Sequence, residues 1–204
     1  EDIEKILSQI PHNAQKLLFS ATMSADIMDL ARSHMKNPQK VKMEVYVDKS
    51  KLMQHYYEVP RFRKFSLLVH VIKKQAKGLV IIFCATRHIV DSVSRNLSKQ
   101  GVKAEPIHGG LTQSRRTHVM DEFKRGKLDV LVASDVAARG LDIKDVNLII
   151  NYDIPKTSQE YVHRIGRTAR AGNEGSVISL LTQEDYDNFR RVLGTAAKND
   201  NRPW

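Results

Sequence analysis

The chain has 204 residues, of which 41% are hydrophobic and 27% are charged, and its formal net charge at pH 7 is +10. This length suits one large domain, or one domain together with a piece of another, and the apolar content is enough for a buried core. The excess of lysine and arginine favours a polyanionic partner, of which nucleic acid is the commonest. Charge alone does not distinguish RNA from DNA or from an acidic membrane surface.

The single cysteine, Cys84, excludes an internal disulfide and a zinc cluster made of cysteines. Because Cys84 ends the apolar run LVIIFC (79–84), we expect a core residue rather than a nucleophile. Every apolar run is shorter than the ~18 residues of a membrane-spanning helix, and residues 1–10 lack the pattern of a signal peptide. We therefore expect an intracellular protein with no membrane partner, without distinguishing cytoplasm from nucleus or nucleolus. Since the first residue is not methionine, we also expect a piece excised from a longer chain.

The first part of the chain predicts a strand, a helix and a second strand. KLLFS (16–20) is a short apolar run typical of a buried strand, and KVKMEV (40–45) alternates as a half-buried strand does. Between them, Ser24 is a good N-cap for a helix that Pro38 terminates. The residues expected on the apolar face of this helix are Ile27, Leu30, Ala31 and Met35. Residues 46–51 are polar and lack helical periodicity, which predicts a linker.

From residue 52 onward, strands and helices alternate. The predicted strands cover 52–59, 79–84, 102–107, 128–133, 146–151 and 175–181, and the predicted helical segments cover 61–77, 88–100, 112–125, 136–139, 158–166 and 183–197. Residues 198–204 are expected to fray. The side chains expected to face the core from the first and last of these helices are Phe62, Phe65, Leu68, Val69, Ile72, Tyr186, Phe189 and Leu193. The alternation predicts a mostly parallel sheet with helices on both faces, and ligand sites at the carboxyl ends of the strands.

One loop that follows a predicted strand is rich in glycine and polar residues. In HGGLTQSRR (108–116), Gly109 and Gly110 let backbone N–H groups approach a ligand, and the N-terminus of the next helix favours an anion. Gln113 and Arg116 are three residues apart and share a helix face. The competing interpretation is a glycine turn followed by a solvated polar helix face.

A second loop of this kind is SDVAARGLDI (134–143). Ser134 and Asp135 are suited to cap a short helix. Further along, Arg139 and Asp142 flank a glycine, and a carboxylate in such a loop accepts hydrogen bonds from a sugar hydroxyl in other nucleotide sites. A salt-bridged turn is the alternative.

The stretch YVHRIGRTARAG (161–172) has a dense positive charge. Arg164, Arg167 and Arg170 recur every three residues, so on a helical turn they are expected to point to a common side. The planar guanidinium fits phosphate oxygens and keeps its charge. With no acid nearby, three cations that repel one another favour a phosphate site over a solvated basic face. His163 has a second interpretation, a packed and hydrogen-bonded core histidine.

Six stretches together resemble, in order and spacing, the later motifs of DEAD-box RNA helicases. They are SAT (20–22), IIFCAT (81–86), HGGLTQSRR (108–116), SDVAARGLDI (134–143), INYDIP (150–155) and HRIGRTARAG (163–172). The last two are highly specific, and the likeness extends over nearly the whole chain.

The family core consists of two RecA-like domains joined by a flexible linker. The resemblance implies that residues 1–45 are the tail of the first domain, that 46–51 are the linker, and that 52–197 form the second domain, a RecA-like three-layer sandwich. The chain contains no G-x-x-x-x-G-K-T loop and no Asp-Glu-Ala-Asp sequence, which hold the ATP phosphates and Mg²⁺ on the first domain of the family. We therefore expect that this chain does not hydrolyse ATP by itself.

The resemblance also implies roles for individual residues. Arg167 and Arg170 look like the pair that reaches the γ-phosphate of ATP, and Asp142, beside Gly140, resembles the residue that meets the ribose. The positions that match residues facing the RNA backbone are Thr86, Gly109, Gln113, Arg116, Ser134 and Asp135. The positions that match residues coupling ATP to RNA across the cleft are Ser20, Thr22 and His163.

Two residues depart from the family pattern. Ser134 stands where threonine is common, and it keeps the hydroxyl. Ala169 stands where glycine is common, which is tolerable if its φ is negative. Neither departure removes a group that the implied chemistry needs.

The implied function is that of an ATP-dependent RNA helicase which binds the RNA backbone without reading its sequence. Its other expected partners are its own N-terminal RecA-like domain and protein cofactors. Two alternatives stay open at this point. One is a non-catalytic RecA-like module that docks RNA or protein, and the other is a DNA-directed helicase of the same superfamily.

Overall fold

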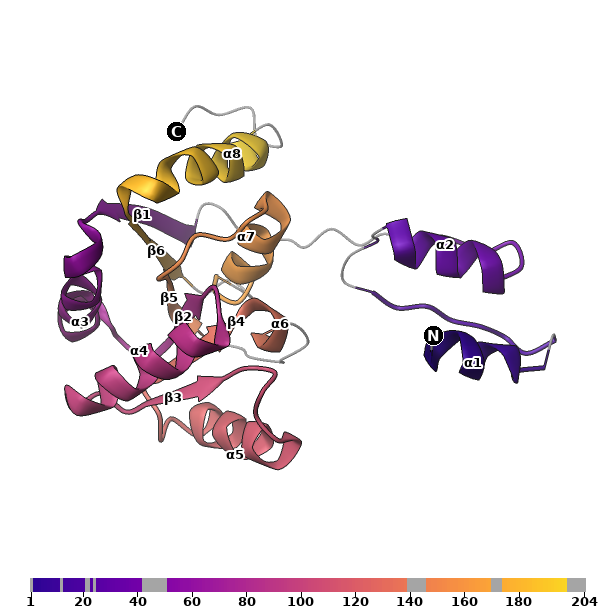
Figure 1. Ribbon diagram of the computed structural model, residues 1–204, viewed down its shortest axis with the longest axis horizontal. Helices are drawn as coiled ribbons and strands as arrows, with labels where there is room; N and C mark the ends of the chain where they lie inside the picture. The colour runs from indigo at the N-terminus through magenta and orange to yellow at the C-terminus, as the bar shows by residue number, and fades with distance from the viewer. Residues whose placement is uncertain are drawn as a thin grey trace. The chain divides into compact units, whose positions relative to one another are not determined.

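The computed structural model describes residues 2–11, 13–20, 23, 25–41, 51–138, 146–169 and 174–197. The chain divides into two compact units, residues 1–44 and residues 45–204. Figure 1 shows helices layered on strands in the second unit and helices joined by loops in the first. The N-cap predicted at Ser24, the tail 198–204 and nearly all of the strand and linker predicted at 40–51 lie outside the described residues.

The second unit is built on a six-stranded sheet whose neighbouring strands all run parallel. The strands are β1 (Leu52–Glu58), β2 (Leu79–Cys84), β3 (Ala104–Ile107), β4 (Val130–Ser134), β5 (Val146–Asn151) and β6 (Gly175–Leu181). Their order across the sheet is β1-β6-β5-β2-β4-β3. At its centre, Ile81 of β2 pairs in register with Leu131 and Ile149. Because all strands point the same way, the loops that follow them emerge along one side of the sheet, called here the carboxyl edge.

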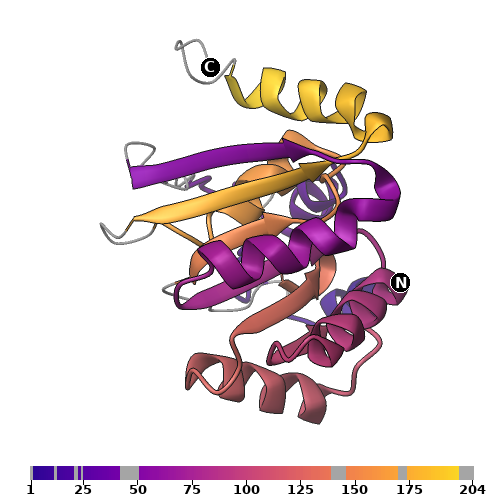
Figure 2. The ribbon, with the colours of Figure 1, turned by 90° about the vertical axis from the view of Figure 1, so that its left-hand side faces the viewer.

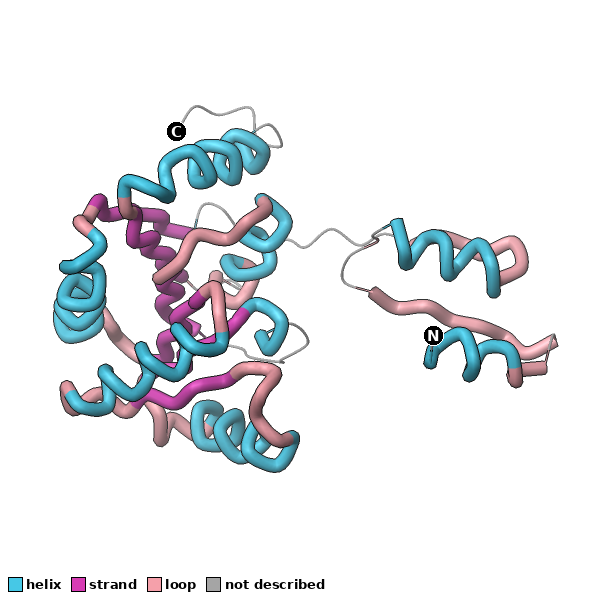
Figure 3. Tube along the Cα trace, in the orientation of Figure 1, coloured by secondary structure: helices cyan, strands magenta, loops and turns pink. Residues whose placement is uncertain are grey.

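Helices cover both faces of the sheet. On one face lie α3 (Lys64–Gln75) and α4 (Arg87–Lys99), and Figure 2 shows α3 across the front of the strands. On the other face lie α5 (Gln113–Lys124), α7 (Ser158–Ile165) and α8 (Tyr186–Ala197), together with the short α6 (Asp135–Ala138). Figure 3 shows the strands of this unit enclosed by these helices.

Alternation along each strand sends successive side chains to opposite faces, which gives the unit two apolar layers. Ile81 and Phe83 belong to the layer beneath α5 and α7, whereas Val80 and Ile82 belong to the layer beneath α3 and α4. All four side chains are at most 1% exposed. The prediction of an α/β three-layer sandwich is confirmed, and the sheet is wholly rather than mostly parallel.

The prediction that Phe62 faces the core is wrong, because Phe62 is 81% exposed. Residues Arg61–Arg63 form a separate 3₁₀ turn, so the helical period of α3 does not extend back to Phe62. The inward position at the start of α3 belongs to Lys64, which is 7% exposed. Its ammonium group lies 3.5 Å from a carboxylate oxygen of Asp153 and 3.5 Å from one of Asp185, which offset the cost of burying the charge.

The first unit contains α1 (Asp2–Ser8) and α2 (Ala25–His34). Ala31 is buried in α2, and the other residues predicted on its apolar face are half-buried. The strand predicted at 16–20 is an extended loop without strand pairing among the described residues, and Leu17 and Phe19 are 69% and 90% exposed. A strand needs a neighbour to accept and donate its backbone hydrogen bonds, and the described part of this unit supplies none.

Candidate functional site

Three predicted site loops meet at the carboxyl edge because they follow three neighbouring strands. Thr86 follows β2, Gly109 follows β3, and Ser134 is the last residue of β4, which lies between them. The register places Cys84 beside Ser134 and Ile107 beside Ala133. Segments separated by about fifty residues in sequence thus present their polar groups side by side.

Two helix N-termini open onto this edge, and each is capped by a threonine. The Thr86 hydroxyl accepts a hydrogen bond from the Ile89 N–H at 3.2 Å, and the Thr112 hydroxyl accepts one from the Arg115 N–H at 3.3 Å. The first N–H groups of a helix lack partners within the helix, and together with the helix dipole they favour an anion. The N-termini of α4 and α5 therefore suit a ligand that carries several negative charges.

The two glycines between β3 and α5 differ in their surroundings. A methyl group added at Gly109 would meet no atom within 4 Å, so this backbone is open to an approaching ligand. A methyl group at Gly110 would lie 3.1 Å from Nδ1 of His108 and 3.4 Å from a guanidinium nitrogen of Arg87. Arg87 was not singled out by the sequence reasoning, although it follows Thr86 directly and its side chain lies over this turn.

Gln113 and Arg116 share a face of α5, as their spacing predicted. The Arg116 guanidinium donates to the Gln113 side-chain oxygen at 3.3 Å. Its Nε atom is buried and has no protein partner, unlike the other buried side-chain polar atoms in the described part of the chain. A buried N–H without a partner is costly, and a ligand oxygen would satisfy it.

The interpretation of the arginine run needs correction at Arg164. Its side chain was predicted to share a phosphate-binding face with Arg167 and Arg170. Instead it is 2% exposed and is paired with an acid. Its Nε and Nη2 atoms donate to the two carboxylate oxygens of Asp135, each at 2.7 Å. Nη1 donates to the side-chain oxygen of Asn151 at 2.9 Å and to the Asp153 carbonyl at 2.6 Å, while the guanidinium lies 4.9 Å from the ring centroid of Phe83.

This ion pair occupies the carboxylate of Asp135, which the resemblance had placed against RNA. Asp135 begins α6 directly after Ser134, and Arg164 lies in the last turn of α7. The pair therefore ties the loop that presents Ser134 to the helix that leads into Arg167. The buried Cys84 thiol nearby has its pKa raised well above its ordinary value, first by burial and then by Asp153, which agrees with a core residue rather than a nucleophile.

The end of α7 carries the remaining described residues of the arginine stretch. His163 and Arg167 are half-buried, and the Arg167 N–H donates to the Arg164 carbonyl at 3.0 Å. Ala169 is 3% exposed and adopts a positive φ of 52°. The negative φ at which alanine would replace glycine without strain is therefore not found. An alanine in the left-handed region carries strain of roughly 1–2 kcal/mol, which glycine would avoid.

Several predicted site residues are not placed by the structure. Arg170, Gly140, Asp142 and Thr22 lie outside the described residues. Ser20 belongs to an exposed loop of the first unit. Within the described ranges there is no group of three histidine, cysteine or acidic side chains that could hold a metal ion, and no helix there has the length and apolar character to cross a membrane.

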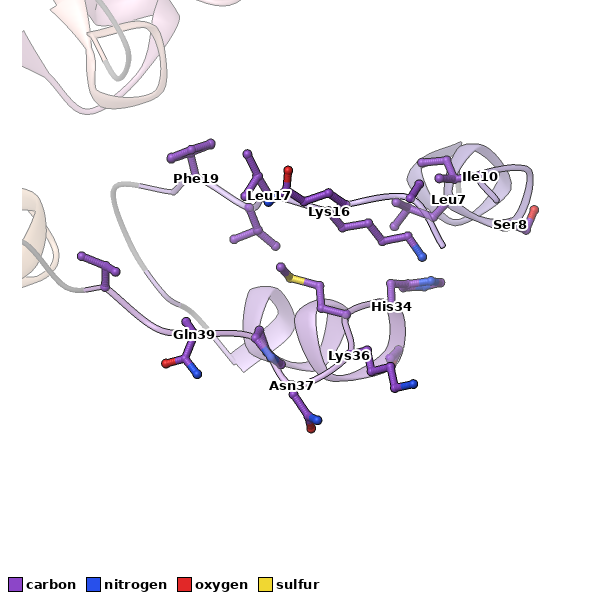
Figure 4. A pocket seen from close by; sticks show the side chains of 17 residues that line it. Leu7, Ser8, Ile10, Lys16, Leu17, Phe19, His34, Lys36, Asn37 and Gln39 are labelled. Carbon is purple, nitrogen blue, oxygen red and sulfur yellow. The ribbon is translucent and has the colours of Figure 1, made fainter. Parts of the chain in front are cut away.

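One cavity is lined by residues of the first unit. It has a volume of about 990 Å³ and lies within the first unit (Figure 4). Leu17 and Phe19 lie on one side of it, and His34 and Lys36 at the end of α2 lie on the other. A second cavity of about 370 Å³ lies in the second unit, where Lys64 and Asp153 line it together with Arg61 and His88.

Comparison with known proteins assigns the chain to a family. The family model described as the helicase conserved C-terminal domain matches residues 63–172, more than half of the chain. The chain belongs to that family. This domain contains all the described groups of the carboxyl edge that are discussed above.

Individual relatives place this helicase domain among the DEAD-box proteins. The DEAD-box ATP-dependent RNA helicase CshA of Bacillus licheniformis is 43% identical over 203 residues, which are 99% of this chain and 42% of the relative. A DEAD-box protein of Methanococcus jannaschii has a structure with a TM-score of 0.68 and 36% identity, over 95% of this chain and 52% of that one.

Saccharomyces cerevisiae Dbp5 bound to RNA and ADP BeF3 gives a TM-score of 0.79 and 27% identity, over 96% of this chain and 51% of that one. The resemblance found in the motifs is thereby confirmed. The chain spans about two fifths of the length of the CshA proteins that it matches.

Proposed function

We propose that this chain is the C-terminal part of an ATP-dependent RNA helicase, which binds the RNA backbone and supplies arginines to an ATP site shared with a first RecA-like domain. The observation that carries the proposal is the Arg164–Asp135 pair, since it joins the loop of Ser134 to the helix that leads into Arg167. A movement of one is transmitted to the other through a buried, bidentate contact.

The RNA side of the proposal rests on the groups gathered at the carboxyl edge. Two helix N-termini, the open backbone at Gly109, and the guanidinium groups of Arg87 and Arg116 all suit phosphate oxygens. These groups suit the sugar-phosphate backbone, and contacts to the backbone carry no sequence information. We therefore propose that Thr86, Gly109, Gln113, Arg116 and Ser134 contact the backbone of a single strand, independently of its sequence.

Asp135 has a different place in this proposal from the one that the resemblance implied. Both of its carboxylate oxygens accept hydrogen bonds from Arg164, so its charge is directed into the domain. An acid turned toward phosphates would repel them, whereas this one is neutralised by its partner. We propose that Asp135 acts on RNA binding by holding the loop, and that its main-chain groups are the ones near the ligand.

The ATP side of the proposal rests on the chemistry of arginine. Arg167 and Arg170 are proposed to contact the γ-phosphate, and Gly140 and Asp142 the ribose. ATP would supply the energy that alternates binding and release of RNA. We propose that the Mg²⁺ ion is held mainly by motifs of the first domain.

The division of the chain is proposed in the same terms. Residues 1–45 would be the tail of the first RecA-like domain, 46–51 the linker, and 52–197 the complete second domain. Ser20, Thr22 and His163 would couple the two ligands across the cleft. The chain alone is expected to be silent as an ATPase.

The first test is RNA binding by this chain, measured by fluorescence anisotropy with single-stranded RNA and with DNA of the same sequence. We expect salt-sensitive binding that depends little on sequence and favours RNA over DNA. Equal affinity for the deoxy strand would favour a DNA-directed helicase. RNA binding by the longer protein without any ATP turnover would favour the docking module.

A further inference from the structure

His108 links the loop that follows β3 to helix α4. The residue follows β3 and is 6% exposed. Its Nδ1 atom accepts a hydrogen bond from the Gly110 N–H at 3.1 Å, and its Nε2 atom lies 2.9 Å from a carboxylate oxygen of Asp91 on α4. Both ring nitrogens are thus engaged, one with the turn before α5 and the other with α4.

The two partners determine where the ring carries its proton. A backbone N–H only donates, so Nδ1 must be bare in order to accept from Gly110. The carboxylate of Asp91 only accepts, so the proton lies on Nε2. With a fixed partner at each end, the imidazole has one tautomer and one orientation.

The ring holds elements whose ends carry proposed RNA contacts. Asp91 is in the second turn of α4, whose N-terminus presents Thr86 and Arg87. Gly110 lies two residues before Thr112, the N-cap of α5, whose first turn presents Gln113 and Arg116. Gly110 allows this contact because it has no side chain, whereas a methyl group there would lie only 3.1 Å from Nδ1 of His108.

We infer that His108 is a positioning residue that, held by Asp91, sets the spacing between the N-termini of α4 and α5 at which phosphates of one RNA strand bind. This rests on the proposed function. Two helix N-termini that share a polyanion must keep a fixed separation, because the phosphates of a strand are regularly spaced. The Asp91 side chain is 42% exposed and that of His108 is 8% exposed, so the contact also satisfies a buried ring N–H. Thermal unfolding separates this contribution to stability from the effect on RNA binding.

The chain offers a matched control in the middle of the same helix, about one turn after Asp91. The buried Ser94 hydroxyl of α4 donates to the Ala104 carbonyl at the start of β3, at 3.2 Å. It therefore also ties α4 to the β3 segment, but far from the carboxyl edge. Replacing Ser94 removes a link between the same elements without touching the spacing of the N-termini.

The test is a double-substitution cycle on this chain, with RNA affinity from fluorescence anisotropy and folding from thermal unfolding. His108→Asn leaves an amide oxygen for the Gly110 N–H but loses Asp91, and Asp91→Ala loses the same contact from the other side. Each is expected to weaken RNA binding about ten-fold, and the double variant no further than either single one. Ser94→Ala is expected to lower the melting temperature while leaving RNA affinity unchanged.

Each outcome has a definite meaning. If the unsubstituted chain fails to bind RNA, the proposed function falls and this inference with it. If the chain binds RNA and both single variants bind equally well, or if their effects simply add, only this inference is overturned. Nitrogen-15 NMR of His108 in the unsubstituted chain gives a readout that needs no variant: a proton on Nε2 is expected, and a proton on Nδ1 would overturn the inference.

Discussion

The guanidinium of Arg164 grips the carboxylate of Asp135 through two hydrogen bonds of 2.7 Å, and both residues lie beneath the carboxyl edge. Arg164 is almost wholly buried, so its charge depends on this partner and on the oxygens of Asn151 and Asp153. The contact links the Ser134 loop to α7. It therefore underlies both the fold of the domain and the proposed coupling of RNA to ATP.

Arg164→Ala is expected to lower the free energy of unfolding by about 3–5 kcal/mol, because it leaves Asp135 without its partner in a partly desolvated site. The matched control is Arg115→Ala, which breaks the Arg115–Glu105 pair at the same distance of 2.7 Å. That pair is substantially exposed, so we expect a loss of about 0–1 kcal/mol. Urea unfolding measures the free energy of unfolding of both variants. Equal losses would contradict the claim that burial makes the Arg164–Asp135 pair more important for stability than the exposed pair.

Ala169→Gly is expected to stabilise the domain, because glycine relieves the strain at a φ of 52°. The gain should be about 0.5–1 kcal/mol after the greater freedom of glycine in the unfolded chain is subtracted. Ala137, which is 2% exposed and helical, provides the control. Ala137→Gly should destabilise the domain, and a loss of stability in both variants would contradict a strained Ala169.

Gly109→Ala and Gly110→Ala separate folding from ligand binding. The first adds a methyl group in open space, so the unfolding free energy should stay within about 0.5 kcal/mol of the unsubstituted chain. Its RNA affinity should nevertheless fall, because the methyl group would occupy the place proposed for a phosphate. The second presses on the His108 ring and should lower stability as well. Unchanged RNA affinity in Gly109→Ala would show that RNA does not approach this backbone.

The raised pKa of Tyr161 predicts that the domain loses stability at alkaline pH. Burial raises its pKa from 10.0 to about 12, while Arg164 acts in the opposite direction, and its hydroxyl donates to the Gln54 side-chain oxygen at 2.6 Å. The unfolded chain ionises this group first, so its stabilising contribution is complete below about pH 10 and is lost as the pH rises toward about 12.

The corresponding measurement is the free energy of unfolding from about pH 9 to about pH 12, for the chain and for Tyr161→Phe. The unsubstituted chain should lose roughly 2–3 kcal/mol more than the variant over this interval. Tyr152, whose pKa burial also raises to about 12, stays in both chains and so cancels from the difference. Parallel pH profiles would contradict the shifted pKa of Tyr161.

The central strands were predictable because their apolar runs are continuous. LVIIFC and the runs at 146–151 and 175–181 became β2, β5 and β6 with the predicted bounds. The exposure of Phe62 was not predictable from periodicity, because a 3₁₀ turn ends the helical phase before α3 begins. KLLFS (16–20) is apolar enough for a strand, but a strand also needs a neighbouring strand to pair with. The sequence of the segment itself does not specify that neighbour.

The sequence indicated which residues belong to the candidate site better than it indicated the contacts between them. Arg164 and Asp135 are 29 residues apart, and no periodicity relates them until the sheet brings β4 and α7 together. The three arginines therefore looked equivalent in sequence, whereas the fold buries one of them. The contacts behind the role proposed for His108 were not predictable for the same reason, since Asp91 lies in α4 and Gly110 in the loop before α5.

The most direct test of the proposed function is RNA-stimulated ATP hydrolysis by the longer protein, with a complete first RecA-like domain ahead of this chain. Arg167→Ala is compared with the unsubstituted protein and with Arg95→Ala, an exposed arginine of α4 outside the proposed site. We predict that Arg167→Ala lowers RNA-stimulated turnover by about 10³-fold or more, while Arg95→Ala has little effect. Unchanged turnover in Arg167→Ala would contradict the claim that this domain completes the ATP site.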